Sequence, residues 1–516
     1  MKVVTAKQMQ ELDRLASERY GVPTARLMER AGEQLLAALD ARFTPLTDKR
    51  MLIVAGKGHN GGDGLVLARL LRQRQIAVDT YLAAERASLQ GLVKDQLTRL
   101  EQAGGAVHDR TQWSLDRLRE AASSSDVIVD ALLGTGLSAP VEGLYAELIQ
   151  IINHSGVPVL AVDLPSGINA DTGHVMGSAV RAQITVTFAL PKLGLLLHPG
   201  AEHAGHVIVG DIGIPQEAVA QLPIVTEQIT PAAIGRALAP RAPQQHKGHF
   251  GHLLVIAGSV GKTGAAALCA LGGLRGGAGL VTIASPSSLN ATLEGLVMEA
   301  MTAPVAETVD QTIAEAALPA VARLLDGKRA VALGPGLSQH PETQAFARAL
   351  LPTLTCPTVI DADGLNALAG HEALVAKCRA PMVLTPHPGE MARLLGCSAA
   401  QVEEDRPAAA RDAATRYRAW VVLKGARTLL AAPDGRLWIN TTGNPGMATG
   451  GTGDVLTGLI GGFLAQSIPL PDAAAAAIYL HGLAGDLAAE QLGQICLIAG
   501  DLLDALPAAF RRARTE

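Results

Sequence analysis

The segment MLIVAGKGHNGGDGLVLARLL (residues 51–71) begins as an apolar strand, passes through a glycine-rich turn and ends as an amphipathic helix. Its strand part is apolar throughout, whereas its helical part repeats apolar residues at helical spacing. The same order recurs up to about residue 214, with the strand candidates AVDTYLAA, DVIVDALLG, PVLAVDLPSG and ITVTFAL. This alternation predicts an α/β domain in which helices cover a parallel sheet.

A proline-rich stretch marks the expected end of this domain. After Ile214 the alternation lapses, and Pro215, Pro223, Pro231, Pro240 and Pro243 follow. Strands and helices resume at HLLVIAGS (residues 252–259) and continue to a helical, alanine-rich end. We therefore expect two domains, residues 1–220 and a larger α/β domain at residues 221–516, which suits a chain of 516 residues.

The composition argues against several classes of protein. The 43 basic and 48 acidic residues give a net charge of −5, and aromatic residues make up only 3%, so neither charge nor stacking favours a nucleic-acid partner. The five cysteines form no CxxC pair, which is typical of a reducing cytoplasm. Charged residues interrupt the N-terminus, and glycines and Pro469 break the apolar stretch 455–470. We expect no signal peptide and no membrane span.

Three strand ends of the first half carry polar residues. GKGHNGGDG (residues 56–64) opens a helix whose free amides favour an anion, Asp130 ends a second strand before a glycine turn, and Asp163 and Ser166 end a third. Each feature alone is also explained as a tight turn or a helix cap. Ligands collect at the carboxyl ends of parallel strands, so the three turns together predict one binding crevice.

These motifs, HNGGDG, VDALLGTGL and VDLPSGINADTG, resemble those of the NAD(P)H-hydrate epimerases, and the resemblance covers nearly the whole first half with a Rossmann-like sheet. It implies a potassium ion bound by Asn60, Asp130 and Ser166. His59 stands where the family motif more often has asparagine. The implied contacts to the hydrated nicotinamide nucleotide are His59, Asn60, Gly61, Gly62, Asp63, Gly134, Thr135, Gly136, Leu137, Ser138, Ala139, Pro140 and Asp163.

Epimerisation of such a hydrate needs little more than proton transfer. The hydroxyl sits on a carbon next to a ring nitrogen, whose lone pair can help the hydroxyl leave or the ring open, and either path erases the stereocentre. The protein must supply a positioned proton donor and acceptor. Asp163 is the candidate catalytic residue, with Lys192 as its helper.

The second half contains a glycine-rich helix entry, NPGMATGGTGDVLTGLIGGF (residues 444–463). Free amides and the helix dipole stabilise phosphate charge there, and Asp454 in the first turn can take a proton from an attacking hydroxyl. This is the layout of a phosphoryl-transfer site, although a plain entry to a buried helix is the alternative. GSVGKTGA (residues 258–265) does not have the spacing of a Walker A loop, because Ile256 stands where that motif needs glycine.

Together, GTGD, KGART, TPHPGE and DADGLNAL resemble the ribokinase-like fold and, within it, the ADP-dependent NAD(P)H-hydrate dehydratases. In that family the substrate hydroxyl takes the β-phosphate of ADP, which then leaves to give NAD(P)H, AMP and phosphate, with Mg²⁺ beside the nucleotide. The resemblance gives Asp454 the catalytic role. It assigns Ala265, Gly336, His387 and Asp454 to the hydrate, and Lys424, Gly425, Ala426, Arg427, Thr428 and Gly453 to the adenine nucleotide.

Two alternatives stay open at this point. The second half could be a kinase for a vitamin precursor, since GTGD serves that chemistry equally well, and the HPGE residues could be helix-start signals. The first half could be a binding scaffold, because similar Rossmann-like domains occur in RNA-processing assemblies. We favour one bifunctional repair enzyme, a cytoplasmic homo-oligomer whose partners are the small molecules hydrated NADH or NADPH and ADP.

Overall fold

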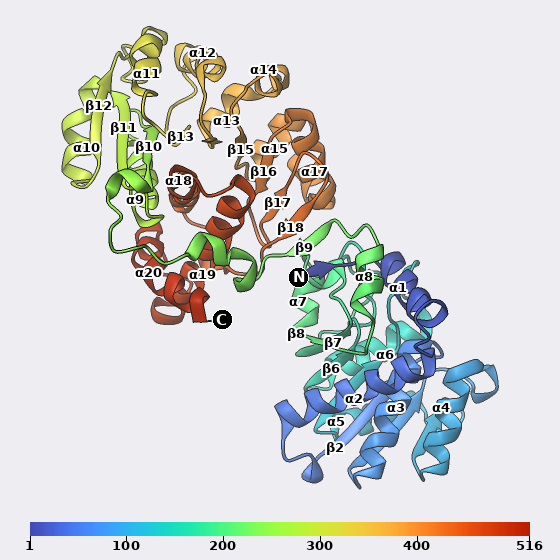
Figure 1. The fold of residues 1–516 in the computed structure, drawn as a ribbon. Coiled ribbons are helices and arrows are strands. Elements are labelled where there is room, and N and C mark those ends of the chain that lie inside the picture. Colours follow the sequence, from blue (N-terminus) through green and yellow to red (C-terminus); the bar gives the residue numbers. More distant parts are fainter. Residues whose placement is uncertain (516) are drawn as a thin grey trace. The chain divides into compact units, whose positions relative to one another are not determined.

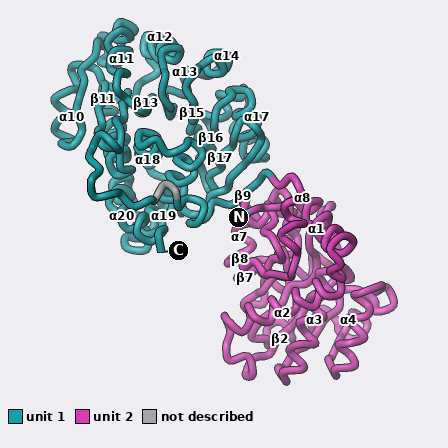
Figure 2. The backbone as a smooth tube through the Cα atoms, in the orientation of Figure 1, with its two compact units in different colours: residues 1, 225–516 teal, residues 2–224 magenta. Residues whose placement is uncertain are grey.

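The chain forms two compact units. The computed structural model describes the backbone of residues 1–515. It describes their side chains too, except those of residues 236–238. Residues 2–224 form the N-terminal unit, and residues 225–516 together with Met1 form the C-terminal unit (Figure 2). Each unit has its own sheet and its own hydrophobic core.

The N-terminal unit is built on a seven-stranded sheet with the order β4-β3-β2-β5-β6-β7-β8, and every pair in it is parallel. Figure 1 labels β2, β6, β7 and β8 of this sheet. Its strands are β2 (Arg50–Ala55), β3 (Ala77–Leu82), β4 (Ala106–Asp109), β5 (Val127–Ala131), β6 (Val159–Val162), β7 (Ile184–Phe188) and β8 (His206–Gly210). The sequence predicted five of these strands and missed β4 and β8, the two strands at the edges of the sheet. The strand order reverses between β2 and β5, and such a switch point opens a crevice at the carboxyl ends of the two strands.

Helices cover both faces of this sheet. One core lies under α2 (Thr24–Phe43), α3 (His59–Gln73) and α4 (Gly91–Gln102), and a second lies under α5 (Leu115–Ser123) and α6 (Gly143–His154). The remaining helices are α1 (Ala6–Glu18), α7 (Gly200–Ala204) and α8 (Gln216–Gln221). Helix α1 begins at a capping box in which Thr5 and Gln8 satisfy each other's backbone amides. It buries Met9, Leu12 and Ala16, so Asp13 stands at the edge of its buried stripe.

The C-terminal unit has a longer mixed sheet, in which β9-β18-β17-β16-β15-β14-β13-β10-β11-β12 are neighbours in that order. Its strands are β9 (Thr226–Gln228), β10 (His252–Ile256), β11 (Leu280–Pro286), β12 (Met301–Val305), β13 (Ala330–Leu333), β14 (Thr358–Ile360), β15 (Met382–Leu384), β16 (Trp420–Leu423), β17 (Leu429–Ala431) and β18 (Leu437–Ile439). From β12 to β16 all pairs are parallel, whereas β17 is antiparallel to both of its neighbours. A second switch point lies between β10 and β13.

The largest core of this unit lies between the sheet and a group of apolar helices: α9 (Thr263–Arg275), α18 (Thr452–Ala465), α19 (Leu470–Leu492) and α20 (Ala499–Thr515). The other helices are α10 (Asn290–Leu296), α11 (Leu318–Leu324), α12 (Pro341–Leu350), α13 (Asp363–Leu368), α14 (Glu372–Ala376), α15 (Pro388–Leu395), α16 (Ala399–Glu404) and α17 (Arg406–Tyr417). The apolar stretch around α18 is a buried helix, as the sequence predicted. No helix in residues 1–515 is long and apolar enough to cross a membrane.

Glycines on both helices let α9 and α18 pack backbone against backbone, and we call this contact the glycine seam. A Cβ added at Gly458 would lie 1.9 Å from the carbonyl oxygen of Cys269. A Cβ at Gly462 would lie 2.5 Å from the carbonyl oxygen of Gly273, and one at Gly272 would lie 2.5 Å from that of Val455. The seam seats α18, and with it the glycine-rich turn at its N-terminus, directly on α9.

Gly458→Ala is therefore expected to destabilise the C-terminal unit. The methyl group overlaps a backbone atom that cannot rotate away, and overpacking of this kind costs about 3 kcal/mol. The melting temperature should fall by roughly 6–12 °C. Gly295→Ala is the matched control, because Gly295 also lies in a helix and its added Cβ would meet nothing within 4 Å. Equal melting temperatures for the two variants would contradict the close approach of α9 and α18.

Candidate functional site

A cavity of about 920 Å³ opens at the carboxyl ends of β2 and β5 in the N-terminal unit. Its volume is within the range of small-molecule sites. The turns after β2, β5 and β6 all contribute to its wall, as the sequence predicted. The predicted substrate contacts that line it are His59, Asn60, Asp63, Gly134, Thr135, Gly136, Leu137, Ser138, Ala139, Pro140 and Asp163.

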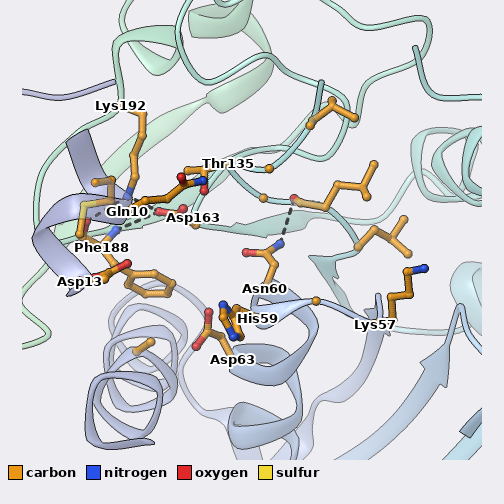
Figure 3. A pocket seen from close by; sticks show the side chains of 18 of the residues that line it. Gln10, Asp13, Lys57, His59, Asn60, Asp63, Thr135, Asp163, Phe188 and Lys192 are labelled. Carbon is orange, nitrogen blue, oxygen red and sulfur yellow. Dashed lines mark hydrogen bonds and ion pairs between the residues drawn. The ribbon is translucent and has the colours of Figure 1, made fainter. Parts of the chain in front are cut away.

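Asp163 is held rigidly at this cavity. Its Oδ1 accepts hydrogen bonds from Lys192 Nζ at 2.5 Å, Thr187 Oγ1 at 3.1 Å and the Phe188 amide at 3.2 Å. Lys192 is 1% exposed, and Asp163 is its only carboxylate partner among the described residues. All three donors meet Oδ1, so none of them occupies Oδ2. Figure 3 shows Asp163 beside Lys192 in the cavity. The backbone of Asp163 has φ +63°, a region that costs a non-glycine residue about 1 kcal/mol or more and that recurs at functional sites.

Two further carboxyl groups face the same cavity, Asp63 from α3 and Asp13 from α1. Burial raises the pKa of Asp13 to about 6 against the opposing charge of Lys192, and Asp163 adds to the rise. Burial also raises the pKa of Asp63 well above its usual value, and both Asp163 and Asp13 contribute. The cavity thus holds one carboxylate paired with a lysine and two carboxyl groups whose pKa values are raised.

Gly61 and Gly62 lie behind the lining rather than in it. A Cβ at Gly61 would lie 1.9 Å from the carbonyl oxygen of Gly56, and one at Gly62 would lie 2.7 Å from the Met28 side chain. The packing of the turn therefore already requires glycine at both positions. Their contact with substrate stays a prediction.

The predicted potassium ligands come together beneath the cavity. Ser166 donates from its amide and its hydroxyl to the two oxygens of Asp130, at 2.7 and 2.6 Å. Asn60 Nδ2 donates to the carbonyl oxygen of Leu133 at 3.0 Å, and the Leu133 amide donates to Ser166 Oγ at 2.8 Å. Asp130 is fully buried, and burial raises its pKa to about 6 although the Ser166 hydrogen bonds oppose the rise.

In the C-terminal unit, Asp454 lies in the first turn of α18. Gly451, the residue before the helix, has φ +93° and no side chain caps the first turn, so its amides are free for a ligand. Burial raises the pKa of Asp454 to about 7; Asp361 and Glu390 add to the rise, and Lys424 opposes it. A carboxyl group with such a pKa can accept a proton near neutral pH.

Lys424 stands at the centre of this second site. Its Nζ lies 2.6 Å from Asp361 Oδ1 and 3.8 Å from Glu390 Oε2. Although burial alone would lower the pKa of Lys424, the carboxylates of Asp361 and Glu390 raise it. Thr457 Oγ1 donates to the other oxygen of Asp361 at 2.7 Å, and a Cβ at Gly453 would lie 3.3 Å from Lys424 Nζ. The ammonium group is therefore fixed beside the glycine-rich turn.

The other predicted residues of this half follow Lys424 in the chain, cap α15, or lie after β10 and β13, where the strand order reverses. Gly336, with φ +63°, packs so closely on Ala265 that its added Cβ would lie 3.1 Å from the alanine Cβ. His387 caps α15 by accepting a hydrogen bond from the Gly389 amide at 3.0 Å, so the helix-start interpretation of HPGE also holds. The remaining predicted nucleotide contacts, Gly425, Ala426, Arg427 and Thr428, form the loop between β16 and β17.

The sequence interpretation missed two residues that the structure adds to these sites. Asp13 belongs to a helix whose apolar spacing predicts only a buried stripe. The residues next to it in the sequence form no motif that indicates a ligand. Thr457 follows Gly453 by one helical turn, so the periodicity of α18 could have placed it on the side that faces Lys424.

Comparison with known proteins finds a family model in each half of the chain. A family model described as NAD(P)H-hydrate dehydratase matches residues 253–508, and one described as YjeF-related protein N-terminus matches residues 24–194. The bifunctional NAD(P)H-hydrate repair enzyme of Moorella thermoacetica is 45% identical over 518 residues, which cover 100% of this chain and 98% of the relative. The enzyme of the same name from Thermofilum pendens is 41% identical and is covered to 97%.

The chain belongs to the family of bifunctional NAD(P)H-hydrate repair enzymes. A solved repair-enzyme relative corresponds to its second half, the ADP/ATP-dependent NAD(P)H-hydrate dehydratase from Bacillus subtilis, which was co-crystallized with ATP and Mg²⁺. That structure is 34% identical, has a TM-score of 0.50, and covers 56% of this chain and 98% of its own length. The ribokinase-like fold expected for the C-terminal unit is thereby confirmed.

The oxygen atoms beneath the cavity suit the potassium ion that the sequence analysis predicts. Asn60, Asp130 and Ser166 each carry a side-chain oxygen, and the carbonyl oxygen of Leu133 lies among them. Oxygen atoms are the ligands that hard cations prefer. A cation there would also offset the buried charge of Asp130. The described residues hold no cluster of three or more histidine, cysteine or acidic side chains arranged to bind a metal.

Proposed function

We propose that the two units act in sequence on hydrated NADH or NADPH. The N-terminal unit interconverts the R and S epimers, and the C-terminal unit uses ADP to dehydrate the S epimer to NAD(P)H, with release of AMP and phosphate. The observation that carries this proposal is the pairing, in one chain that matches repair enzymes over its full length, of a carboxylate-lined cavity with a phosphoryl-transfer turn.

In the first unit, Asp163 carries out the proton transfer that lets the substrate hydroxyl leave or the ring open, and so erases the stereocentre. Lys192 holds one of its oxygens, so the other is presented to the substrate in a fixed orientation. Potassium at Asn60, Asp130 and Ser166 would supply positive charge beneath the turns after β5 and β6, and would keep them in place around the nucleotide.

In the second unit, Asp454 takes the proton from the hydroxyl of the hydrate. The hydroxyl oxygen attacks the β-phosphate of ADP and AMP leaves. The phosphorylated carbon then loses phosphate as the ring nitrogen donates its lone pair, and loss of a proton from the neighbouring ring carbon to solvent restores the double bond. Lys424 and the free amides at the start of α18 stabilise the charge of the transferred phosphoryl group. The nucleotide loop runs from Lys424 to Thr428, and Ala265, Gly336 and His387 hold the hydrate.

An equal mixture of the two hydrate epimers tests both activities at once. With ADP and Mg²⁺, the purified full chain should return all of the absorbance of NADH and release one phosphate per hydrate. If only half of the NADH absorbance returns, the chain has no epimerase activity and that part of the proposal is wrong. A stable phosphorylated product in place of NADH would instead support a small-molecule kinase, and an ATP titration beside ADP measures which nucleotide is used.

The dehydratase rate should rise with pH through about 7. Asp454 acts in its ionised form and its pKa is raised to about 7, so the active fraction falls as pH drops below that value. We expect about a tenfold loss of kcat for each pH unit below 6, measured with the S epimer and saturating ADP. A rate independent of pH between 5.5 and 8 would show that Asp454 does not take the proton.

We also propose that the enzyme acts as a homo-oligomer in a reducing cytoplasm. All five cysteines are unpaired, which suits such a compartment. Light scattering on the purified chain measures the oligomeric state.

A further inference from the structure

Helix α1 contributes a carboxyl group to the cavity from outside the segment that the N-terminal family model covers. That model matches residues 24–194, whereas Asp13 lies on α1 together with Met9 and Gln10, which also line the cavity. The capping box at Thr5 fixes the start of α1, and its buried stripe packs beside Asp13. The position of the Asp13 carboxyl group is thus determined by the fold, not by a flexible terminus.

Asp13 is placed to complement Asp163. Figure 3 shows its side chain beside Phe188, on the side of the cavity that also holds Lys192 and Asp163. Asp163 is bound through Oδ1 to the buried lysine, whereas no hydrogen bond reaches the Asp13 carboxyl group from the described residues. Asp163 is therefore held as a carboxylate, whereas the oxygens of Asp13 are free to carry a proton toward the substrate.

The epimerisation proposed above needs a donor as well as an acceptor, and Asp163 with Lys192 supplies only the acceptor. We propose that Asp13 is the proton donor of the epimerase site, acting on the ring nitrogen of the hydrate while Asp163 acts on its hydroxyl. This inference rests on the proposed epimerase function and adds a catalytic residue to it.

The reaction is balanced with these two groups alone. Asp163 takes the hydroxyl proton as the carbon–oxygen double bond forms, the bond from that carbon to the ring nitrogen breaks, and Asp13 gives its proton to the nitrogen. Rotation about the neighbouring carbon–carbon bond presents the other face of the aldehyde. Closure of the ring then reverses both proton transfers, so each carboxyl group ends in the state in which it began.

The electrostatics of the cavity suit this division. The charged groups that act on Asp13 are Lys192 and Asp163, and Asp63 faces it across the cavity from α3. Its pKa of about 6 lies close to physiological pH, where a carboxyl group can both give and regain a proton. Burial and the other two carboxylates raise the pKa of Asp63 as well.

Asp13→Asn in the full chain tests the proposal, with Glu11→Gln as the matched control. Glu11 lies on the same helix but outside the cavity, where it pairs with Arg14. We expect Asp13→Asn to lower kcat for epimerisation about 100-fold or more with KM changed less than about threefold, and Glu11→Gln to change neither. Dehydration of the S epimer should be the same in all three proteins, which shows that the C-terminal unit of each is folded and active, and a nearly unchanged KM for epimerisation shows the same for the N-terminal unit.

The pH profile separates a proton donor from a positioning residue. Since the donor acts when protonated, the wild-type rate of epimerisation should fall as pH rises above about 6, after subtraction of the uncatalysed rate. This fall should disappear in Asp13→Asn and return in Asp13→Glu, with part of the rate. Epimerisation by Asp13→Asn within fivefold of wild type, or a slower reaction with an unchanged pH profile, would overturn the role of Asp13. If the wild-type chain does not epimerise at all, the proposed function itself fails.

Discussion

Asp163→Asn is expected to leave a protein that restores only half of a mixed hydrate sample. The S epimer should be dehydrated at the normal rate, and the R epimer should then disappear no faster than it epimerises in buffer. The amide keeps the shape of the carboxylate but cannot accept a proton at its nitrogen, so epimerisation should slow by roughly 10³-fold. Absorbance of NADH against time, with ADP in excess, gives a fast phase of half the full amplitude.

The same variant also breaks a buried ion pair. Lys192 loses its carboxylate, and removal of one partner of such a pair destabilises a protein by about 3–5 kcal/mol. Hydrate binding and thermal melting of the variant therefore have to be measured beside its activity. A variant that still binds the hydrate but does not epimerise it establishes the chemical role, and retained epimerisation would exclude Asp163 from the mechanism.

Asp454→Asn should abolish the return of NADH from either epimer. The hydroxyl of the hydrate keeps its proton, so it does not attack the β-phosphate, and we expect a loss of roughly 10³-fold or more in kcat. Epimerisation should continue, and a sample of pure R epimer should still reach its equilibrium mixture. Chromatography of the epimers and phosphate release measure the two activities separately.

Asp504→Asn is the control for this loss, because Asp504 is an exposed acidic residue of α20 whose side chain is 83% accessible. Mixing the Asp454→Asn and Asp163→Asn proteins supplies a second control. Each carries one intact site and the hydrate is a free small molecule, so the mixture should again convert the whole sample. Failure of the mixture to exceed half conversion would mean that the two reactions require one and the same chain.

The architecture of both units could be predicted because their strands and helices alternate with clear periods. The five strands of the first sheet that the sequence predicted are apolar runs bounded by turn residues. The missed strands are edge or near-edge elements: β4 is the four residues Ala106–Asp109, half of them polar or charged, and β8 follows a short helix. A strand that is only partly buried does not need a continuous apolar run, so its sequence carries a weak signal.

Much of both sites could be predicted for a related reason. Parallel strands bring their carboxyl ends to one edge, so Asp163 and the glycine turns had to meet once the strand order was right. The lysine partners of the carboxylates follow less directly, since Lys192 and Lys424 reach Asp163 and Asp361 across 29 and 63 residues of sequence. Asp13 could not be found at all, because its role depends on where a separate helix docks and not on any local motif.

The glycine seam has a consequence for how this protein can change over generations. Elsewhere in a core, an enlarged side chain can be absorbed by neighbours that move into other rotamers, but at Gly458 the obstacle is the peptide backbone of α9. A shift there moves α18 as a rigid rod, and Asp454 moves with it. A substitution in the seam is therefore disfavoured for two reasons: it destabilises the fold, and it displaces a catalytic residue. We expect these buried positions, remote from any ligand, to tolerate as little variation as the residues that carry out the chemistry.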